Sequence, residues 1–127
     1  MKQPTPLRVL VVDDHHDGAE TLGITLQQLG CDVSLTHSGE EAIEVAPTFI
    51  PELVILDLYM PPGMDGYQTA VELRKQTWSA TATFVAHSGS NDPKVAENVR
   101  NAGFGYFVPK PANPEAFEAI LNALREM

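Results

Sequence analysis

The chain has 127 residues, a length typical of one domain that buries about two-thirds of its unfolded surface. Seventeen acidic residues against eight basic ones give a formal charge of −9, which argues against nucleic acid or an anionic membrane as a direct ligand. The one cysteine, Cys31, cannot form an internal disulfide, and without a signal peptide or an apolar run of about 18 residues the sequence predicts a cytoplasmic protein.

The first half of the chain alternates predicted strands with predicted helices. An apolar run over 7–12 predicts a strand, and apolar residues at helical spacing over 19–29, closed by a glycine, predict the helix that follows. Residues 32–36 alternate polar and apolar side chains, as expected for an edge strand with one wetter face. Ser38 begins a short helix with capping-box spacing, and we expect Pro47 to end it.

The second half continues this alternation from a central apolar run. Uninterrupted apolar residues over 53–56 end in Asp57 and then break into a Pro/Gly loop, which predicts a strand buried on both faces. The elements expected after it are a helix over 65–76, a strand over 83–86, a helix from 93 that is capped by Asp92 and stopped by Gly103, a strand over 106–108, and a helix capped by Asn113.

Five strands that alternate with five helices predict a doubly wound α/β fold with a parallel sheet, formed by residues 1–127 as one domain. Right-handed crossovers place the C-terminal ends of all five strands at one edge of the sheet. Ligands of such sheets bind outside that edge. The side chains expected there are Asp13 and Asp14 after the first strand, Asp57 after the third, Ser88 after the fourth and Lys110 after the fifth.

Three carboxylates at one edge repel one another and need counter-charge. At about 5 Å and an effective dielectric of about 20, each pair costs roughly 3 kcal/mol. Lys110 supplies one positive charge, and a hard divalent cation with oxygen ligands, Mg²⁺ above all, supplies the rest. A metal, an ammonium and a hydroxyl around a free carboxylate suit phosphoryl transfer, in which Asp57 acts as nucleophile and Ser88 hydrogen-bonds a phosphoryl oxygen.

With Met60-Pro61 and residues 64–66 behind the central aspartate, these five residues resemble the receiver domain of two-component response regulators. The resemblance covers essentially the whole chain. It implies a flavodoxin-like three-layer (βα)5 sandwich with strand order 2-1-3-4-5. It also implies that Asp57 accepts a phosphoryl group from a sensor histidine kinase or a histidine phosphotransfer protein.

The resemblance assigns a role in metal binding to four residues. Asp14, Asp57 and the backbone carbonyl of Tyr59 would hold Mg²⁺ directly, and Asp13 would act largely through water. A domain of this kind is not an enzyme, because it catalyses only its own phosphorylation and dephosphorylation.

The resemblance also assigns the phosphoryl-binding and switch residues. Lys110 would pair with the phosphoryl group and be joined to Pro111 by a cis bond, and Ser88 and Phe107 would form the switch pair. The signal would leave through the surface of the fourth helix, fifth strand and fifth helix to a downstream protein, with homodimerisation as a further possibility. A stand-alone regulator and a receiver excised from a larger protein both fit the sequence.

Two positions depart from the family pattern. The family usually has one residue between the proline and the methionine that follow the acceptor, whereas this chain has two, Pro62 and Gly63. Gly89 stands where a small residue such as alanine is usual. Both departures lie in loops, so we expect them to affect phosphate access and rates while the fold is unchanged.

Two other functions are alternatives to the hypothesis that the chain is a receiver domain. A haloacid-dehalogenase-like phosphatase also uses an aspartate at a strand end with Mg²⁺, but it typically carries a second aspartate where this chain has Tyr59. A phosphate-independent adaptor of the same fold usually lacks one of the key residues, and this chain keeps all five.

Three local patterns could be taken for sites of other kinds, but each lacks a feature that such a site requires. The adjacent histidines His15 and His16 lack metal-ligand spacing, so we expect solvated side chains. His87 cannot act as the base for Ser88, because consecutive strand residues point to opposite faces. The Pro/Gly loop over 61–66 lacks the Gly-Lys-Ser/Thr ending of a phosphate-binding P-loop.

Overall fold

The computed structural model describes residues 6–90 and 92–126, so the outermost positions of the expected domain, 1–5 and 127, lie outside the described residues. Its centre is a parallel five-stranded sheet in the order β2-β1-β3-β4-β5, which confirms the predicted topology. The strands are β1 (Leu7–Val12), β2 (Cys31–Thr36), β3 (Leu53–Leu56), β4 (Thr83–Ser88) and β5 (Tyr106–Pro109). β2 lies at an edge of the sheet, as its alternating pattern predicted.

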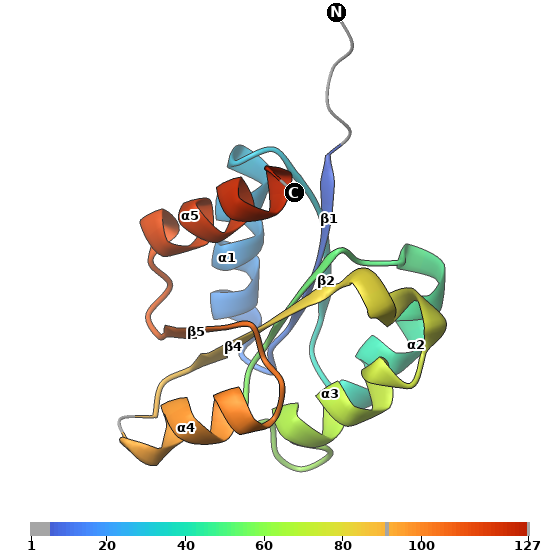
Figure 1. The fold of residues 1–127 in the computed structure, drawn as a ribbon, viewed down its shortest axis with the longest axis vertical. Coiled ribbons are helices and arrows are strands. Elements are labelled where there is room, and N and C mark those ends of the chain that lie inside the picture. The colour runs from blue at the N-terminus through green and yellow to red at the C-terminus, as the bar shows by residue number, and fades with distance from the viewer. Residues whose placement is uncertain (1–5, 91, 127) are drawn as a thin grey trace, which may run out of the picture.

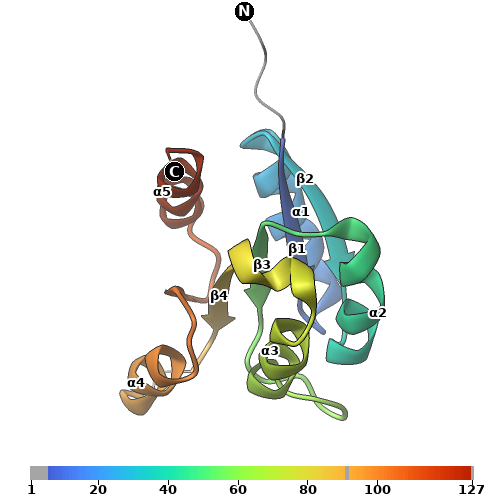
Figure 2. The same ribbon diagram turned by 45° about the vertical axis from the view of Figure 1, so that its right-hand side comes forward.

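Helices cover both faces of the sheet and complete the three-layer sandwich. They are α1 (His16–Gln28), α2 (Gly39–Phe49), α3 (Gly66–Arg74), α4 (Lys94–Asn101) and α5 (Pro114–Arg125), with a short 3₁₀ helix η1 (Thr77–Thr81) before β4. Figures 1 and 2 show α1 and α5 on one side of the sheet and α2 and α3 on the other. Within the described residues, none of these helices combines the length and apolar character needed to cross a membrane.

The alternation of side chains along the central strands divides the interior into two hydrophobic cores. On β3, Val54 and Leu56 pack with residues of α2, α3 and α4, whereas Leu53 and Ile55 pack with residues of α1 and α5. All four side chains are buried. A strand covered on both faces needs apolar residues at every position, which explains the continuous apolar run before Asp57.

Two of the predicted helix caps are present. The Ser38 side chain accepts the Glu41 backbone N–H at 3.0 Å, and the Asn113 side chain accepts the Glu115 N–H at 3.0 Å. The prediction that Asp92 caps α4 is wrong by one residue: α4 begins at Lys94 with Pro93 as its N-cap residue, and Asp92 accepts the Lys94 N–H at 2.9 Å from the position before it.

The prediction that Pro47 ends the second helix is wrong. α2 continues through Pro47 and ends at Phe49, and the C-cap residue Ile50 has its backbone in the left-handed region. A proline inside a helix leaves the carbonyl four residues earlier without its backbone donor. Here that carbonyl belongs to Ile43, and it accepts a hydrogen bond at 3.2 Å from the side-chain amide of Gln76. A distant side chain therefore replaces the lost hydrogen bond.

Other boundaries also differ from the prediction, and the ends of β4 and α3 differ by two residues each. β4 extends to Ser88, because pairing with β5 continues to its end: Ser88 lies opposite Pro109, and its carbonyl accepts the Lys110 N–H at 2.9 Å. α3 ends at Arg74, two residues early, and the Ser79 hydroxyl donates to the Arg74 carbonyl at 3.1 Å. The first difference makes Ser88 the last residue of the strand, so the sheet itself positions its hydroxyl.

Candidate functional site

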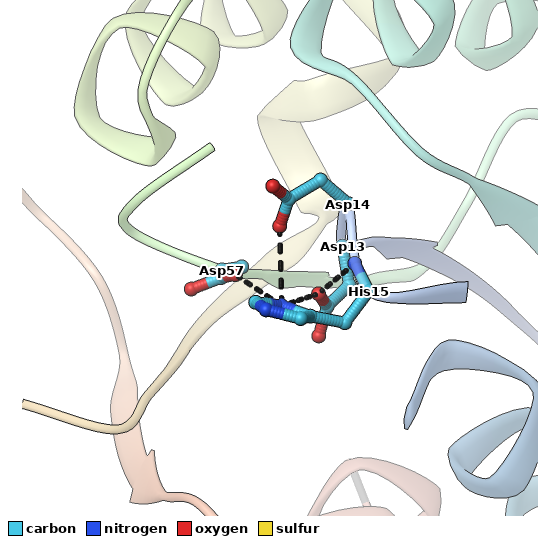
Figure 3. Close-up of side chains that lie close together, drawn as sticks. All are labelled: Asp13, Asp14, His15 and Asp57. Carbon is cyan, nitrogen blue, oxygen red and sulfur yellow. Dashed lines mark hydrogen bonds and ion pairs between the residues drawn. The ribbon is translucent and has the colours of Figure 1, made fainter. Parts of the chain in front are cut away.

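The acidic side chains meet where the two central strands end (Figure 3). Asp13 and Asp14 follow β1, and Asp57 follows the neighbouring β3. The Asp57 N–H donates to the Val12 carbonyl at 2.9 Å, and the Asp13 N–H donates to the Thr36 carbonyl at 3.0 Å. The sheet hydrogen bonds therefore continue one residue beyond the strands and fix the backbone of both aspartates.

Lys110 reaches this cluster from the end of β5. Its Nζ lies 2.9 Å from Asp13 Oδ2 and 3.3 Å from Asp57 Oδ2. The bond from Lys110 to Pro111 is cis, as the family resemblance implied. The structure thus brings together four of the five residues that the sequence placed at this edge, and Ser88 lines the adjoining cavity.

The surroundings of the cluster shift its ionisation. Burial acts to raise the pKa of Asp13, but hydrogen bonds from Lys110 and the His15 backbone, with the Lys110 charge, bring it below its ordinary value. Burial raises the pKa of Asp57; the Lys110 charge opposes this only in part, and the Asp13 charge adds to it. Burial acts to lower the pKa of Lys110, but its contacts with Asp13 and Asp57 raise it overall. Lys110 therefore neutralises Asp13 first, and ionised Asp57 still needs a cation.

The donor set fits a divalent metal ion. Asp14 Oδ1 is buried and has no hydrogen-bond partner within the described part of the chain, so its lone pairs are free on the side that faces the cluster (Figure 3). One ligand atom each from Asp13, Asp14, His15 and Asp57 lie within 4.8 Å of one another. Carboxylate oxygens are the ligands that Mg²⁺ prefers, and Asp14 and Asp57 supply them without displacing Lys110 from Asp13.

His15 belongs to this cluster, which the sequence did not predict. Its side chain is 71% exposed, as expected for a solvated histidine, yet Nδ1 faces the carboxylates (Figure 3). The His15 backbone N–H also donates to Asp13 Oδ1 at 2.9 Å. The available signal was its place directly after Asp14 at a strand end, where a tight turn into α1 directs the side chain back over the acids.

A cavity of about 670 Å³ adjoins Asp57 and is bounded by the ends of β3 and β4 and by α3 and α4. Ser88 is buried at its wall, and its Oγ accepts the Ser90 N–H at 3.4 Å. The Tyr59 N–H lies 3.3 Å from Asp57 Oδ1, whereas the Tyr59 ring is 71% exposed at the rim. The cavity gives a phosphoryl group room beside the carboxylate and the Ser88 hydroxyl.

Phe107 lies away from the acidic cluster. It is half-buried on β5, pairs in register with Ala86, and packs against the core beneath α2, α3 and α4. With Val99 and other residues of α4 it bounds a separate hollow of about 210 Å³. Val99 is the one fully buried residue of α4, so this helix is held by little apolar contact.

Two contacts hold the loop behind Asp57: a backbone hydrogen bond at its C-terminal end, and a hydrogen bond to the side chain of Glu40 earlier in the loop. The Gly66 N–H donates to the Leu58 carbonyl at 3.0 Å, and a β-carbon at Gly66 would overlap the backbone of Asp57 and Leu58. Earlier in the loop, the Glu40 carboxylate accepts the Met64 N–H at 3.0 Å, and the atoms nearest a β-carbon at Gly63 would be those of that carboxylate. Pro62 and Gly63, where the sequence predicts a loop one residue longer than in the family pattern, directly precede the Met64 held by Glu40.

His87 is a buried histidine on the opposite face from Ser88. Its Nδ1–H donates to the Val108 carbonyl at 2.7 Å, and its ring packs edge-on against Phe117 with 5.4 Å between centroids. Burial lowers the pKa of His87, against a smaller opposing effect of the Val108 hydrogen bond. His87 is therefore a neutral core residue with a satisfied donor.

Comparison with known proteins matches the chain to one family. Residues 9–122 match the family model of the response regulator receiver domain. The chain is 32% identical over 117 residues to the probable transcriptional regulator ycf27 of Porphyridium aerugineum, covering 92% of this chain and 47% of that protein. It is 31% identical over 121 residues to the sensor histidine kinase AtsR of Burkholderia thailandensis, covering 94% and 20%.

A solved structure agrees with these matches. A putative response regulator from Chloroflexus aurantiacus has a TM-score of 0.86 at 26% identity, and the match covers 96% of this chain and 99% of that one. The chain spans about half or less of the length of the curated relatives it matches.

Proposed function

This chain belongs to the family of response regulator receiver domains, and we propose that Asp57 is its phosphoacceptor, served by Lys110 and a Mg²⁺ ion held by Asp14 and Asp57. Receiver domains are signalling modules that work with histidine kinases. The match over 9–122 leaves the haloacid-dehalogenase-like hydrolase without support. The observation that carries the proposal is a 4% exposed Asp57 carboxylate that contacts Lys110 and faces a cavity bounded by Ser88.

The chemistry follows from what each side chain touches. A carboxylate oxygen of Asp57 attacks the phosphorus atom, a new P–O bond forms, and the bond from phosphorus to the donor breaks with its electron pair leaving on the donor. When bound, the metal ion neutralises charge on the phosphoryl oxygens. Lys110, which already pairs with Asp57, is placed to bind one of those oxygens, and the Ser88 hydroxyl is placed to donate to another.

The position of Asp57 supports its role as nucleophile over that of its neighbours. Asp13 is the closer partner of Lys110, at 2.9 Å, so its carboxylate is already neutralised. Asp14 has an unpartnered oxygen, which suits a metal ligand. In the same proposal Asp13 acts on the metal through water, the Tyr59 carbonyl completes the ligand set, and residues 1–127 work as one receiver domain that catalyses only its own phosphorylation and dephosphorylation.

Intact mass after incubation with acetyl phosphate and Mg²⁺ tests the phosphoacceptor. We expect wild-type protein to gain one phosphoryl group, Asp57→Asn to gain none, and the control Asp17→Asn, an exposed acid in the first turn of α1, to behave as wild type. A phosphoryl adduct that persists in Asp57→Asn would place the acceptor elsewhere.

The second part of the proposed function is the effect of phosphorylation on the α4-β5-α5 surface. We propose that phosphorylation draws the Ser88 hydroxyl toward the phosphoryl group and lets Phe107 move inward, which shifts α4 and the α4-β5-α5 surface toward a downstream protein or a second copy. The hollow shared by Phe107 and Val99, and the sparse burial of α4, support this route.

Amide chemical shifts test this route. Adding beryllofluoride and Mg²⁺, which mimic the phosphorylated state, should shift the amides of α4 and β5 more than those of α1, because α1 packs in the other core. The Asp57→Asn variant serves as the control and should show no such shifts. A response confined to the loop after Asp57 would contradict the switch.

A further inference from the structure

The ring of His15 points one nitrogen at all three carboxylates (Figure 3). Its Nδ1 lies 3.2 Å from Asp14 Oδ1, 3.3 Å from Asp13 Oδ1 and 3.9 Å from Asp57 Oδ2. Ligand atoms about 2.1 Å from one metal ion are about 3.0 Å apart in an octahedral site and about 3.4 Å apart in a tetrahedral one. The distances from His15 Nδ1 to Asp14 and Asp13 lie within this range, whereas the distance to Asp57 Oδ2 is about half an ångström longer.

The backbone holds His15 in this place without using its side chain. His15 is the N-cap residue of α1, but its side chain makes no capping hydrogen bond, and it is the His15 backbone N–H that donates to Asp13 Oδ1 at 2.9 Å. The neighbouring His16 behaves differently: its ring stacks on His37 with 3.7 Å between centroids and 15° between planes. Two adjacent histidines therefore differ in surroundings, and one of them faces the metal-binding carboxylates.

The unpartnered oxygen of Asp14 is an independent sign of a ligand on this side of the cluster. Asp14 Oδ1 is buried and accepts no hydrogen bond within the described residues, although His15 Nδ1 is 3.2 Å away. A single ion between the two would bind both atoms at once. Lys110 approaches other oxygens of the cluster, Asp13 Oδ2 and Asp57 Oδ2, and Asp13 Oδ1 accepts the His15 N–H, so the oxygen left available to an ion is Asp14 Oδ1.

We propose that His15 Nδ1 is a ligand of the metal centre and makes the site prefer transition-metal ions that bind imidazole, such as Zn²⁺ and Co²⁺, over Mg²⁺. This inference rests on the proposed metal site at Asp14 and Asp57. Imidazole nitrogen suits these borderline ions, whereas Mg²⁺ binds oxygen and gains little from it. A transition-metal ion would occupy the place of Mg²⁺, so the two ions compete for the domain.

Calorimetric titration of the full chain with MgCl₂ and, separately, with ZnCl₂ tests the inference. We expect wild-type protein to bind Zn²⁺ more tightly than Mg²⁺, and the ratio of the two affinities to fall by about tenfold or more in His15→Gln. The Mg²⁺ affinity itself should change by less than about threefold, because glutamine removes no carboxylate. His15 is largely exposed, so the variant should fold.

His16→Gln is the matched control, because it removes an adjacent histidine that stacks on His37 outside the cluster. Its Zn²⁺-to-Mg²⁺ ratio should equal that of wild type, and the imidazole ¹⁵N signal that moves on adding Zn²⁺ should be that of His15. An unchanged ratio in His15→Gln, or a fall only in His16→Gln, overturns the inference while Mg²⁺ binding keeps the proposed function. Failure of wild-type protein to bind Mg²⁺ overturns both.

Discussion

Replacing Asp14 with alanine is expected to lower the Mg²⁺ affinity of the domain by about 100-fold, or about 2.7 kcal/mol, and to remove most phosphoryl incorporation at Asp57. The large effect is expected because of the surroundings of the Asp14 carboxylate. Asp14 Oδ1 is buried without a hydrogen-bond partner in the part of the chain described, and the basic group nearest to it there is the ring of His15, so this oxygen is free to bind an ion. Asp13, by contrast, is committed to Lys110 at 2.9 Å and cannot take over the direct contact without losing that pair.

The measurement is a Mg²⁺ titration followed by amide shifts, together with intact mass after incubation with acetyl phosphate. Asp17→Ala is the control, since Asp17 is an exposed acid in the first turn of α1 and lies outside the cluster. It should bind Mg²⁺ as wild type does. If Asp14→Ala kept the wild-type Mg²⁺ titration, the assignment of Asp14 as a ligand would be wrong.

Replacing Asp57 with asparagine should stabilise the metal-free protein at neutral pH by about 1–2 kcal/mol, which raises the melting temperature by roughly 4–8 °C. Burial raises the pKa of Asp57 above its ordinary value of 3.8, so the folded state binds this proton more tightly than the unfolded state does. The contribution of Asp57 to stability is therefore greatest below pH 3.8 and falls as the pH rises through the folded-state value. Lys110 keeps its closer partner, Asp13, in the variant.

Thermal unfolding in the presence of a chelator, from pH 3 to pH 7, tests this prediction. The gain in stability of Asp57→Asn over wild type should be small at the acidic end and increase toward neutral pH. Mg²⁺ should stabilise the wild type and leave the variant nearly unchanged, because a ligand stabilises only a protein that binds it. Asp32→Asn, on the exposed side of β2, should have no comparable effect. A variant less stable than wild type at pH 7 would contradict the argument.

The fold and the main site residues could be predicted because their signals are local in the sequence. A continuous apolar run that ends in an acid identifies both a central strand and the side chain it carries to the sheet edge, and Asp57 follows β3 as predicted. Parallel topology then determines which strand ends meet. The same reasoning placed Lys110 beside Asp57, from 53 residues away in the sequence.

What could not be predicted depends on contacts between distant segments or on the direction of one turn. Pro47 lies inside α2, where the Gln76 side chain supplies the donor that the Ile43 carbonyl lacks, and no local pattern reveals that pairing. His15 faces the carboxylates because of the turn into α1, whereas sequence spacing treats it and His16 alike. In the first case a hydrogen bond from a distant side chain overrides the rule that proline ends a helix, and in the second a backbone turn overrides the expectation from sequence spacing.

The loop behind Asp57 bears on how this domain can change over evolutionary time. Any side chain at Gly66 would overlap the backbone of Asp57 and Leu58, so substitution there displaces the acceptor itself. At Gly63 the atoms nearest a new β-carbon belong to the flexible carboxylate of Glu40, so substitution there displaces a side chain and its hydrogen bond to Met64 while the backbone of the acceptor is not touched. A change of sequence on the Pro62–Gly63 side of the loop is therefore expected to disturb the acceptor less than a change at Gly66.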